Sequence, residues 1–390
     1  MKSIDSCNIQ FFQSSFRENR TMELKLSSLL LFLLTFSGVV SCQSQDNLGN
    51  FISNECDSLL RNGEIKSLSV GVIKNGKIYK FHKGKLTNGK SPSKHTLYEI
   101  ASLTKTFTGT LLAKAILDKK VGLDDDIRKY LPESYPNLEF NGQPITFRSL
   151  VTHTSGLPNM FPNRPEIFEN PDWDELPFRI NELQTGFTEK QFLEELHQVK
   201  LDTVSGYKFS YSNSGANLLG LCLERMYKNP YEDLVKNHIL KPLEMENTYV
   251  GISNNNSQFL AKGLNVKGIE MPARAEKELN AEGGIISTLD DMIKYMQFGL
   301  DTNNPLIQIS HQELFDGKYG DFENGLFWQI FKNGEKARKI FQNGGAFGTS
   351  SWMTLLPETN TGVFIITNVS GPEVHQKLSI LADKIIEHAE

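Results

Sequence analysis

Short apolar runs that meet at turn residues occur near both ends of this chain, and they limit the folds open to it. Residues 68–73 and 77–81 flank Asn75-Gly76, which is a strong hairpin signal. The C-terminal part repeats the pattern in four further runs: 325–331, 337–341, 350–356 and 362–368. Between them, about 119–299, apolar residues recur at helical spacing. We therefore expect an α+β fold, with one antiparallel sheet built from both chain ends and a mostly helical inserted region.

Amphipathic helices are expected to flank this sheet. Residues 48–61 and 372–388 carry apolar side chains at helical spacing, so both terminal segments should pack on the sheet. The sheet parts then span about 48–118 and 300–390. Thr188 and Gln191 form a capping box, and other helices are predicted at 102–117, 214–226, 230–240 and 289–299.

The overall charge argues against a nucleic acid as the main partner. Lysine and arginine total 41 and aspartate and glutamate total 46, which gives a net charge of −5. Phosphate binding needs a basic surface, so we expect no nucleic-acid partner.

The N-terminal segment is typical of an export signal. Residues 26–40 are mostly apolar and uncharged, follow Lys25, and are too short to span a membrane comfortably. They lead to Ser41-Cys42, an ending that resembles a bacterial lipobox. This predicts a lipoprotein signal peptide at 1–41, lipid attachment at Cys42, and a folded domain at 42–390 that is anchored to the membrane in the cell envelope. A simple secretory signal is the alternative, and Met22 is a possible start.

Apart from Cys42, the expected mature part contains two cysteines, Cys56 and Cys222. Cys222 lies in an apolar helical pattern and reads as a small buried side chain. A disulfide between the two is left open by the sequence.

The helix predicted at 102 begins with a serine and a lysine one turn apart. Ser102 and Lys105 share one helical face at this spacing. A serine hydroxyl becomes a good nucleophile when a neighbouring base takes its proton. Its place at a helix start also offers backbone N–H groups to a developing oxyanion. By itself the pair is common, and it usually means a capped helix with a solvated lysine.

Two further segments carry residues suited to acyl transfer. Tyr211 and Asn213 flank a capping position before an apolar helix; a tyrosine can relay protons and an asparagine amide can hold a carbonyl. Taken alone, a capping loop with a packed tyrosine is the simpler interpretation. The second segment runs through Gln342, Asn343, Gly344 and Gly345, where paired glycines on a strand indicate either a close backbone approach or a bulge.

Together and in this order, the three segments resemble the serine β-lactamase and penicillin-binding-protein superfamily, in its class C and D-alanyl-D-alanine carboxypeptidase-like branch. Residues 98–101, 150–158, 241–245 and 283–288 are also typical of that branch. The resemblance covers roughly residues 67–370. It implies the β-lactamase/transpeptidase-like fold, no cofactor and no metal.

The resemblance assigns a role to each motif residue. Ser102 matches the acylated nucleophile, Lys105 its partner base and Tyr211 the tyrosine of the second motif. Asn213 and Gln342-Asn343-Gly344 match substrate-binding positions, and the N–H of Gly345 is expected to join that of Ser102 in an oxyanion hole. The family usually has lysine or histidine where this chain has Gln342, which puts recognition of a substrate carboxylate in question.

Two neighbouring features allow more than one interpretation. His153 lies in a segment of the branch that resembles structural support. Residues 159–187 carry several aromatic side chains and prolines, and they predict either an aromatic rim over the cleft or an irregular packed insertion.

The predicted function is that of an exported serine hydrolase acting on a β-lactam, a D-alanyl peptide or a small ester. A rival class is a non-catalytic envelope protein that binds penicillins or peptidoglycan peptides. Residues 84–91 match the P-loop pattern, but they follow a hairpin strand and lack the required helix behind them. A nucleotide-hydrolysing function is therefore not expected.

Overall fold

The computed structural model describes the backbone of residues 40–390 except 276–277, 317–321 and 333–337. The chain divides into two compact units, residues 1–50 and 51–390, and the fold below is that of the second. Most of the predicted signal peptide lies outside the described residues. Cys42 falls in helix α2 (Val40–Arg61), but no side chain before residue 47 is described.

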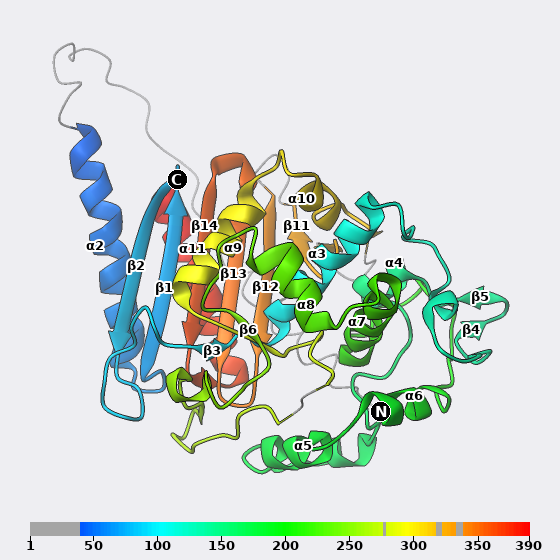
Figure 1. Ribbon diagram of the computed structural model, residues 1–390. Coiled ribbons are helices and arrows are strands. Elements are labelled where there is room, and N and C mark those ends of the chain that lie inside the picture. Colours follow the sequence, from blue (N-terminus) through cyan, green and yellow to red (C-terminus); the bar gives the residue numbers. More distant parts are fainter. Residues whose placement is uncertain (1–39, 276–277, 317–321, 333–337) are drawn as a thin grey trace, which may run out of the picture. The chain divides into compact units, whose positions relative to one another are not determined.

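An eight-stranded sheet forms the centre of the 51–390 unit (Figure 1), in the order β2-β1-β14-β13-β12-β11-β10-β9. All paired neighbours are antiparallel. The pairing of Leu68 with Thr367 joins the two chain ends, which confirms the predicted sheet. Its strands are β1 (Ser67–Lys74), β2 (Lys77–Gly84), β9 (Phe315–Asp316), β10 (Phe322–Asn324), β11 (Gln329–Phe331), β12 (Lys339–Gly345), β13 (Ser350–Leu356) and β14 (Thr361–Thr367).

Helices cover both faces of this sheet. Helix α9 (Leu289–Leu300) lies so close to one face that a Cβ on Gly71 would come within 2.7 Å of Ile293. Helix α11 (Pro372–Ala389) packs on β13 and β14 from the other face. The two faces can be told apart at β12, where a Cβ on Gly344 would meet Ile100 and one on Gly345 would meet His375. Consecutive strand residues point to opposite faces, so Ile100 and α11 lie on opposite sides of the sheet.

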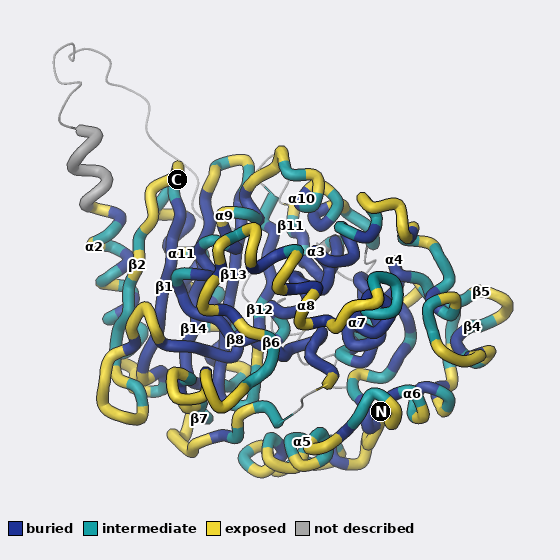
Figure 2. The backbone as a smooth tube through the Cα atoms, in the orientation of Figure 1, coloured by how far each residue is buried: buried dark blue, intermediate teal, exposed yellow. Residues whose placement is uncertain are grey.

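The helical region surrounds α3 (Thr104–Leu117), which is buried along most of its length (Figure 2). Thr188 and Gln191 form the predicted capping box. The other α-helices are α4 (Phe147–Val151), α5 (Leu176–Gln184), α6 (Glu189–Leu196), α7 (Asn213–Tyr227), α8 (Tyr231–Val235) and α10 (Pro305–Ser310); the π-helix is η4 (Lys236–Leu240) and the 3-10 turns are η1 (Ala101–Leu103), η2 (Ile127–Tyr130), η3 (Pro165–Phe168), η5 (Ser257–Phe259) and η6 (Pro357–Thr359).

Three small sheets were not expected from the sequence. They are β3-β8-β6 (Tyr98–Glu99, Ile285–Ser287, Tyr249–Val250), β4-β5 (Glu139–Phe140, Gln143–Pro144) and the parallel pair β15-β7 (Val369–Ser370, Leu264–Asn265). Strands of two or three residues are too short to show an alternating pattern. The strand expected at 325–331 is also shorter, because Phe327 has a φ of +62° and regular pairing begins only at Gln329.

The structure answers two questions that the sequence left open: whether Cys56 and Cys222 form a disulfide, and whether a helix follows the P-loop-like segment. Cys56 and Cys222 are both buried and free, so they form no disulfide. The P-loop-like segment follows β2 as turns, and no helix lies between Gly84 and Tyr98. Among the helices described, none has the length and apolar character that crossing a membrane requires.

Candidate active site

Ser102 lies in the 3-10 turn η1, directly before α3, and Lys105 lies in the first turn of that helix. The Nζ atom of Lys105 is 3.1 Å from the Oγ atom of Ser102. Lys105 is fully buried, while Ser102 keeps partial exposure. The residue before the nucleophile, Ala101, has a φ of +51°, a left-handed conformation that a non-glycine residue rarely adopts. Strained backbone of this kind clusters at functional sites.

Tyr211 reaches the same serine from the loop that precedes α7. Its hydroxyl donates to Ser102 Oγ at 2.7 Å, and Lys105 Nζ lies 5.0 Å from the centroid of its ring. The structure therefore brings the three predicted catalytic residues into contact, although 109 positions separate Tyr211 from Ser102. Their catalytic roles stay predictions.

His153 holds the tyrosine loop on both sides of Tyr211. Its carbonyl accepts from the N–H of Ser210 at 2.7 Å, and its Nδ1 accepts from the N–H of Ser212 at 3.2 Å. The centroids of the His153 and Tyr211 rings are 4.4 Å apart. Burial, and then the charge of Lys105, lower the pKa of His153 to about 3. The imidazole is therefore neutral near pH 7 and acts as an acceptor that positions the loop.

Asn213 begins helix α7, and Ser212 is the N-cap residue whose hydroxyl accepts from the N–H of Gly215 at 2.9 Å. The side-chain N–H₂ of Asn213 donates to Asn159 Oδ1 at 3.0 Å. The amide that was expected to hold a substrate carbonyl thus contacts the loop after residue 158. Its contact with substrate stays a prediction.

Strand β12 approaches the nucleophile turn through Gly344. A Cβ atom at this position would lie 2.1 Å from the carbonyl oxygen of Ile100, a separation that real Cβ atoms do not show. Ser351 Oγ, on the neighbouring strand β13, donates to the same carbonyl at 3.2 Å. Of the two interpretations of the paired glycines, the close backbone approach is confirmed, and it places the Gly344-Gly345 end of β12 beside Ser102.

Gln342 lies on the same face of β12 as Gly344, but its side chain is buried. Its Nε2 donates to the carbonyl of Phe327 at 2.6 Å, and its Oε1 accepts from the N–H of Asn343 at 2.9 Å. Asn343 is half-buried. The structure thus shows one N–H of Gln342 bound to protein, and its role toward a substrate carboxylate is untested.

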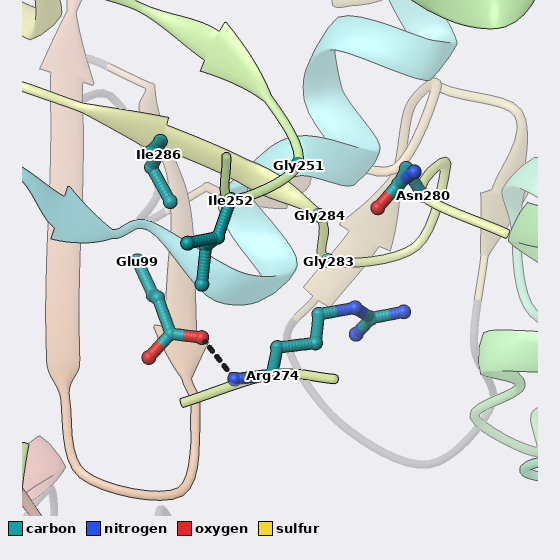
Figure 3. A pocket seen from close by; sticks show the side chains of 8 residues that line it. All are labelled: Glu99, Gly251, Ile252, Arg274, Asn280, Gly283, Gly284 and Ile286. Atoms are coloured by element: carbon teal, nitrogen blue, oxygen red, sulfur yellow. Dashed lines mark hydrogen bonds between the residues drawn. The ribbon is translucent and has the colours of Figure 1, made fainter. Parts of the chain in front are cut away.

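Two charged residues that the sequence did not indicate extend from Lys105: Glu282 contacts Lys105, and Arg274 contacts Glu282. Glu282 precedes β8, and its Oε2 is 3.3 Å from Lys105 Nζ; its Oε1 accepts from Arg274. The backbone N–H of Arg274 donates to Glu99 Oε1 at 3.0 Å in a small pocket formed around β3 and β8 (Figure 3). Burial raises the pKa of Glu99. No motif marks these residues, because the ion pair between Lys105 and Glu282 joins positions 177 apart.

The segment 159–187 combines packed and exposed aromatic residues. Phe161 is buried and packs edge-on against Phe192, whereas Trp173 is 67% exposed and Phe178 40%. The segment also contains helix α5, which the sequence did not predict. Its role as a rim over the cleft stays open. In the described ranges, histidine, cysteine and acidic side chains form no group of three or more suited to hold a metal ion.

The fold and this site together define a class of protein. A mixed α+β unit with a large antiparallel sheet carries a serine in contact with a lysine and a tyrosine, beside a glycine-rich strand end. The chain belongs to the Beta-lactamase family, whose model matches residues 52–385.

The relatives of known name are distant in sequence. The chain is 28% identical over 303 residues to Protein flp of Staphylococcus aureus strain MRSA252, which covers 76% of this chain and 57% of that protein. It therefore spans little more than half the length of that relative. It is 28% identical over 299 residues to the D-alanyl-D-alanine-carboxypeptidase/endopeptidase AmpH of Escherichia coli K12, covering 72% of each.

Solved structures show the same fold. A beta-lactamase/D-alanine carboxypeptidase from Yersinia pestis superposes with a TM-score of 0.71 at 24% identity, over 88% of this chain and 99% of that one. A class C beta-lactamase gives 0.71 at 22% identity, over 90% and 99%. These similarities confirm the expected β-lactamase/transpeptidase-like fold.

Proposed function

We propose that this chain is a serine hydrolase that forms an acyl-enzyme on Ser102 and acts on an amide or ester of the β-lactam, D-alanyl peptide or small-ester type. The observation that carries the proposal is the contact of Ser102 Oγ with both Lys105 Nζ and Tyr211 Oη, at 3.1 and 2.7 Å. A nucleophile within hydrogen-bond reach of proton-accepting groups is the arrangement that covalent catalysis needs. Membership of the Beta-lactamase family supports the same class of activity.

The geometry suits an acyl transfer in two halves. Ser102 Oγ attacks the substrate carbonyl, its proton passes to the Lys105–Tyr211 pair, and the negative charge collects on the carbonyl oxygen. The N–H groups of Ser102 and Gly345 are the proposed donors to that oxygen. The bond from the carbonyl carbon to the leaving nitrogen or oxygen breaks, that atom takes up the proton, and a water molecule then cleaves the acyl ester and restores the serine.

The test is intact-protein mass spectrometry after mixing with a fluorescent penicillin or with a fluorophosphonate. An adduct that maps to Ser102 and then decays is the expected result for the penicillin. Ser102→Ala should prevent labelling, while Ser91→Ala, at an exposed serine after β2, should not. An adduct on another residue would refute the assignment, and a stable Ser102 adduct without turnover would favour the binding-protein alternative.

Export and lipid attachment are part of the proposal, on the evidence of residues 26–42 alone. Expressed from the full sequence in a bacterium, the protein should fractionate with membranes and carry a diacylglyceryl mass at Cys42. Cys42→Ser should release it. An unmodified N-terminus in the wild-type protein would contradict lipidation.

A further inference from the structure

Three charged side chains form a row of ion pairs that begins at Lys105, the residue in contact with Ser102. Glu282 bridges two cations: its Oε2 is 3.3 Å from Lys105 Nζ, and its Oε1 accepts from the guanidinium of Arg274. The side chains of Lys105, Glu282 and Arg274 are 0%, 10% and 14% exposed. Water can therefore screen these charges little, and each charge is stabilised mainly by its partner.

Hydrogen bonds to neighbouring segments hold Glu282 and Arg274 in place. The N–H of Glu282 donates to Asn217 Oδ1 on α7 at 3.1 Å. The N–H of Arg274 donates to Glu99 on β3, as Figure 3 shows, and its Nη2 donates to the carbonyl of Leu279 at 3.0 Å. The carboxylate is thus fixed between the two cations by contacts from several elements.

The contacts of Lys105 match those of an ammonium group. Its Nζ has three acceptors: Ser102 Oγ at 3.1 Å, the Glu282 carbonyl at 2.6 Å and Glu282 Oε2 at 3.3 Å. A lysine ammonium has three N–H donors, so each finds a partner. Burial alone would raise the pKa of Glu282, but Arg274 and Lys105 outweigh burial and hold it below its ordinary value.

We propose that Glu282, held by Arg274, is the positioning residue that keeps Lys105 charged and directed at Ser102. This inference rests on the proposed function. Within the Lys105–Tyr211 pair, Glu282 favours the form in which the proton lies on Lys105. For the oxygen of Tyr211 to accept the proton of Ser102, its hydroxyl must first lose the proton that it donates to Ser102 Oγ.

Other titratable groups lie around Lys105, Glu282 and Arg274 and must be distinguished from them in a pH profile. His153, which feels the charge of Lys105, has a pKa of about 3 because of burial. Burial raises the pKa of Tyr231 on α8, and the charge of Glu282 raises it further. Burial also raises the pKa of Glu99 above its ordinary value. The test therefore compares the alkaline limb of each variant with that of the wild type.

The experiment is the pH profile of kcat/KM for a neutral p-nitrophenyl ester. In Glu282→Gln, Lys105 loses the carboxylate that pairs with it, so the alkaline limb should move to lower pH by about 1 to 3 units. Glu189→Gln is the control, because it breaks an arginine pair with Arg225 that is more exposed and does not contact Lys105, and it should leave the limb in place. A Glu282→Gln profile with the wild-type limb, or one merely scaled down, would overturn the proposal.

A double variant tests the role of Arg274. In Glu282→Gln/Arg274→Met a positive charge is removed together with the carboxylate, so the alkaline limb should return part of the way toward the wild type. This variant keeps the net charge of the cluster, and it serves in place of the single variant if that one does not fold; its limb must still lie below that of the wild type. Wild-type protein that labels at Ser102 but shows no shift in these variants disproves only this inference. Wild-type protein that neither labels nor turns over disproves the proposed function instead.

Discussion

Replacing Gly344 with alanine should separate strand β12 from the turn that carries Ser102. The new Cβ would lie 2.1 Å from the carbonyl oxygen of Ile100 and 2.6 Å from Ser351 Oγ. Ordinary contacts between carbon and oxygen need more than 3 Å, so the two backbones must move apart by about 1 Å. A displacement of that size next to the reacting atoms typically costs about 10²-fold in rate. We expect kcat/KM for a p-nitrophenyl ester to fall by about that factor.

The control for this change is Gly71→Ala, in which the added Cβ would come within 2.7 Å of Ile293 on α9. Both variants overfill a packed interface, so both should lose about 1–3 kcal/mol of unfolding free energy. Only Gly344→Ala lies beside Ser102, and only it should lose activity per folded molecule. Thermal melting and active-site titration separate the two effects. If Gly344→Ala keeps its activity within about twofold, or loses no more than Gly71→Ala, the close approach of β12 is not required for catalysis.

Three further predictions concern the charge and proton chemistry of the protein. The losses in Lys105→Ala and Tyr211→Phe should be strongly non-additive, because both contact Ser102 Oγ; a double variant whose loss equals the product of the single losses would show that they act independently. Gln342→Lys should raise kcat/KM for nitrocefin about fivefold, because a charged donor binds a carboxylate more strongly than a neutral one, and should leave a neutral ester unchanged; an equal response of both substrates would contradict it. Unfolding should become easier below about pH 6.5, because burial lowers the folded-state pKa values of three histidines to about 3, about 3 and about 4, and the unfolded chain therefore binds more protons; urea midpoints that do not fall between pH 7 and pH 5 would contradict it. These are His153, His311 and His375.

The sequence predicted the parts of this protein whose signals are local. Asn75-Gly76 marks a hairpin because the two-residue turn requires positive φ at both positions, and the structure has φ of 49° and 80° there. Other local signals are the apolar runs of β13 and β14, which are seven residues long, and the helical spacing of apolar residues along α11. Ser102 and Lys105 are one turn apart, so helix geometry alone predicts their contact.

The tertiary structure decided everything that depends on residues distant in the chain. Tyr211 was placed at Ser102 by resemblance to a family and not by spacing, since no local rule joins positions 109 apart. Glu282 and Arg274 gave no signal at all, because a glutamate and an arginine in a polar segment look like surface residues until packing buries Glu282 against Lys105 and Arg274 against Glu282. The sequence shows that Gln342 has a side-chain N–H₂ group, but only the fold shows that this group donates to the carbonyl of Phe327. Local backbone preferences thus determined the elements, whereas burial and charge pairing across elements determined the environment in which Ser102 reacts.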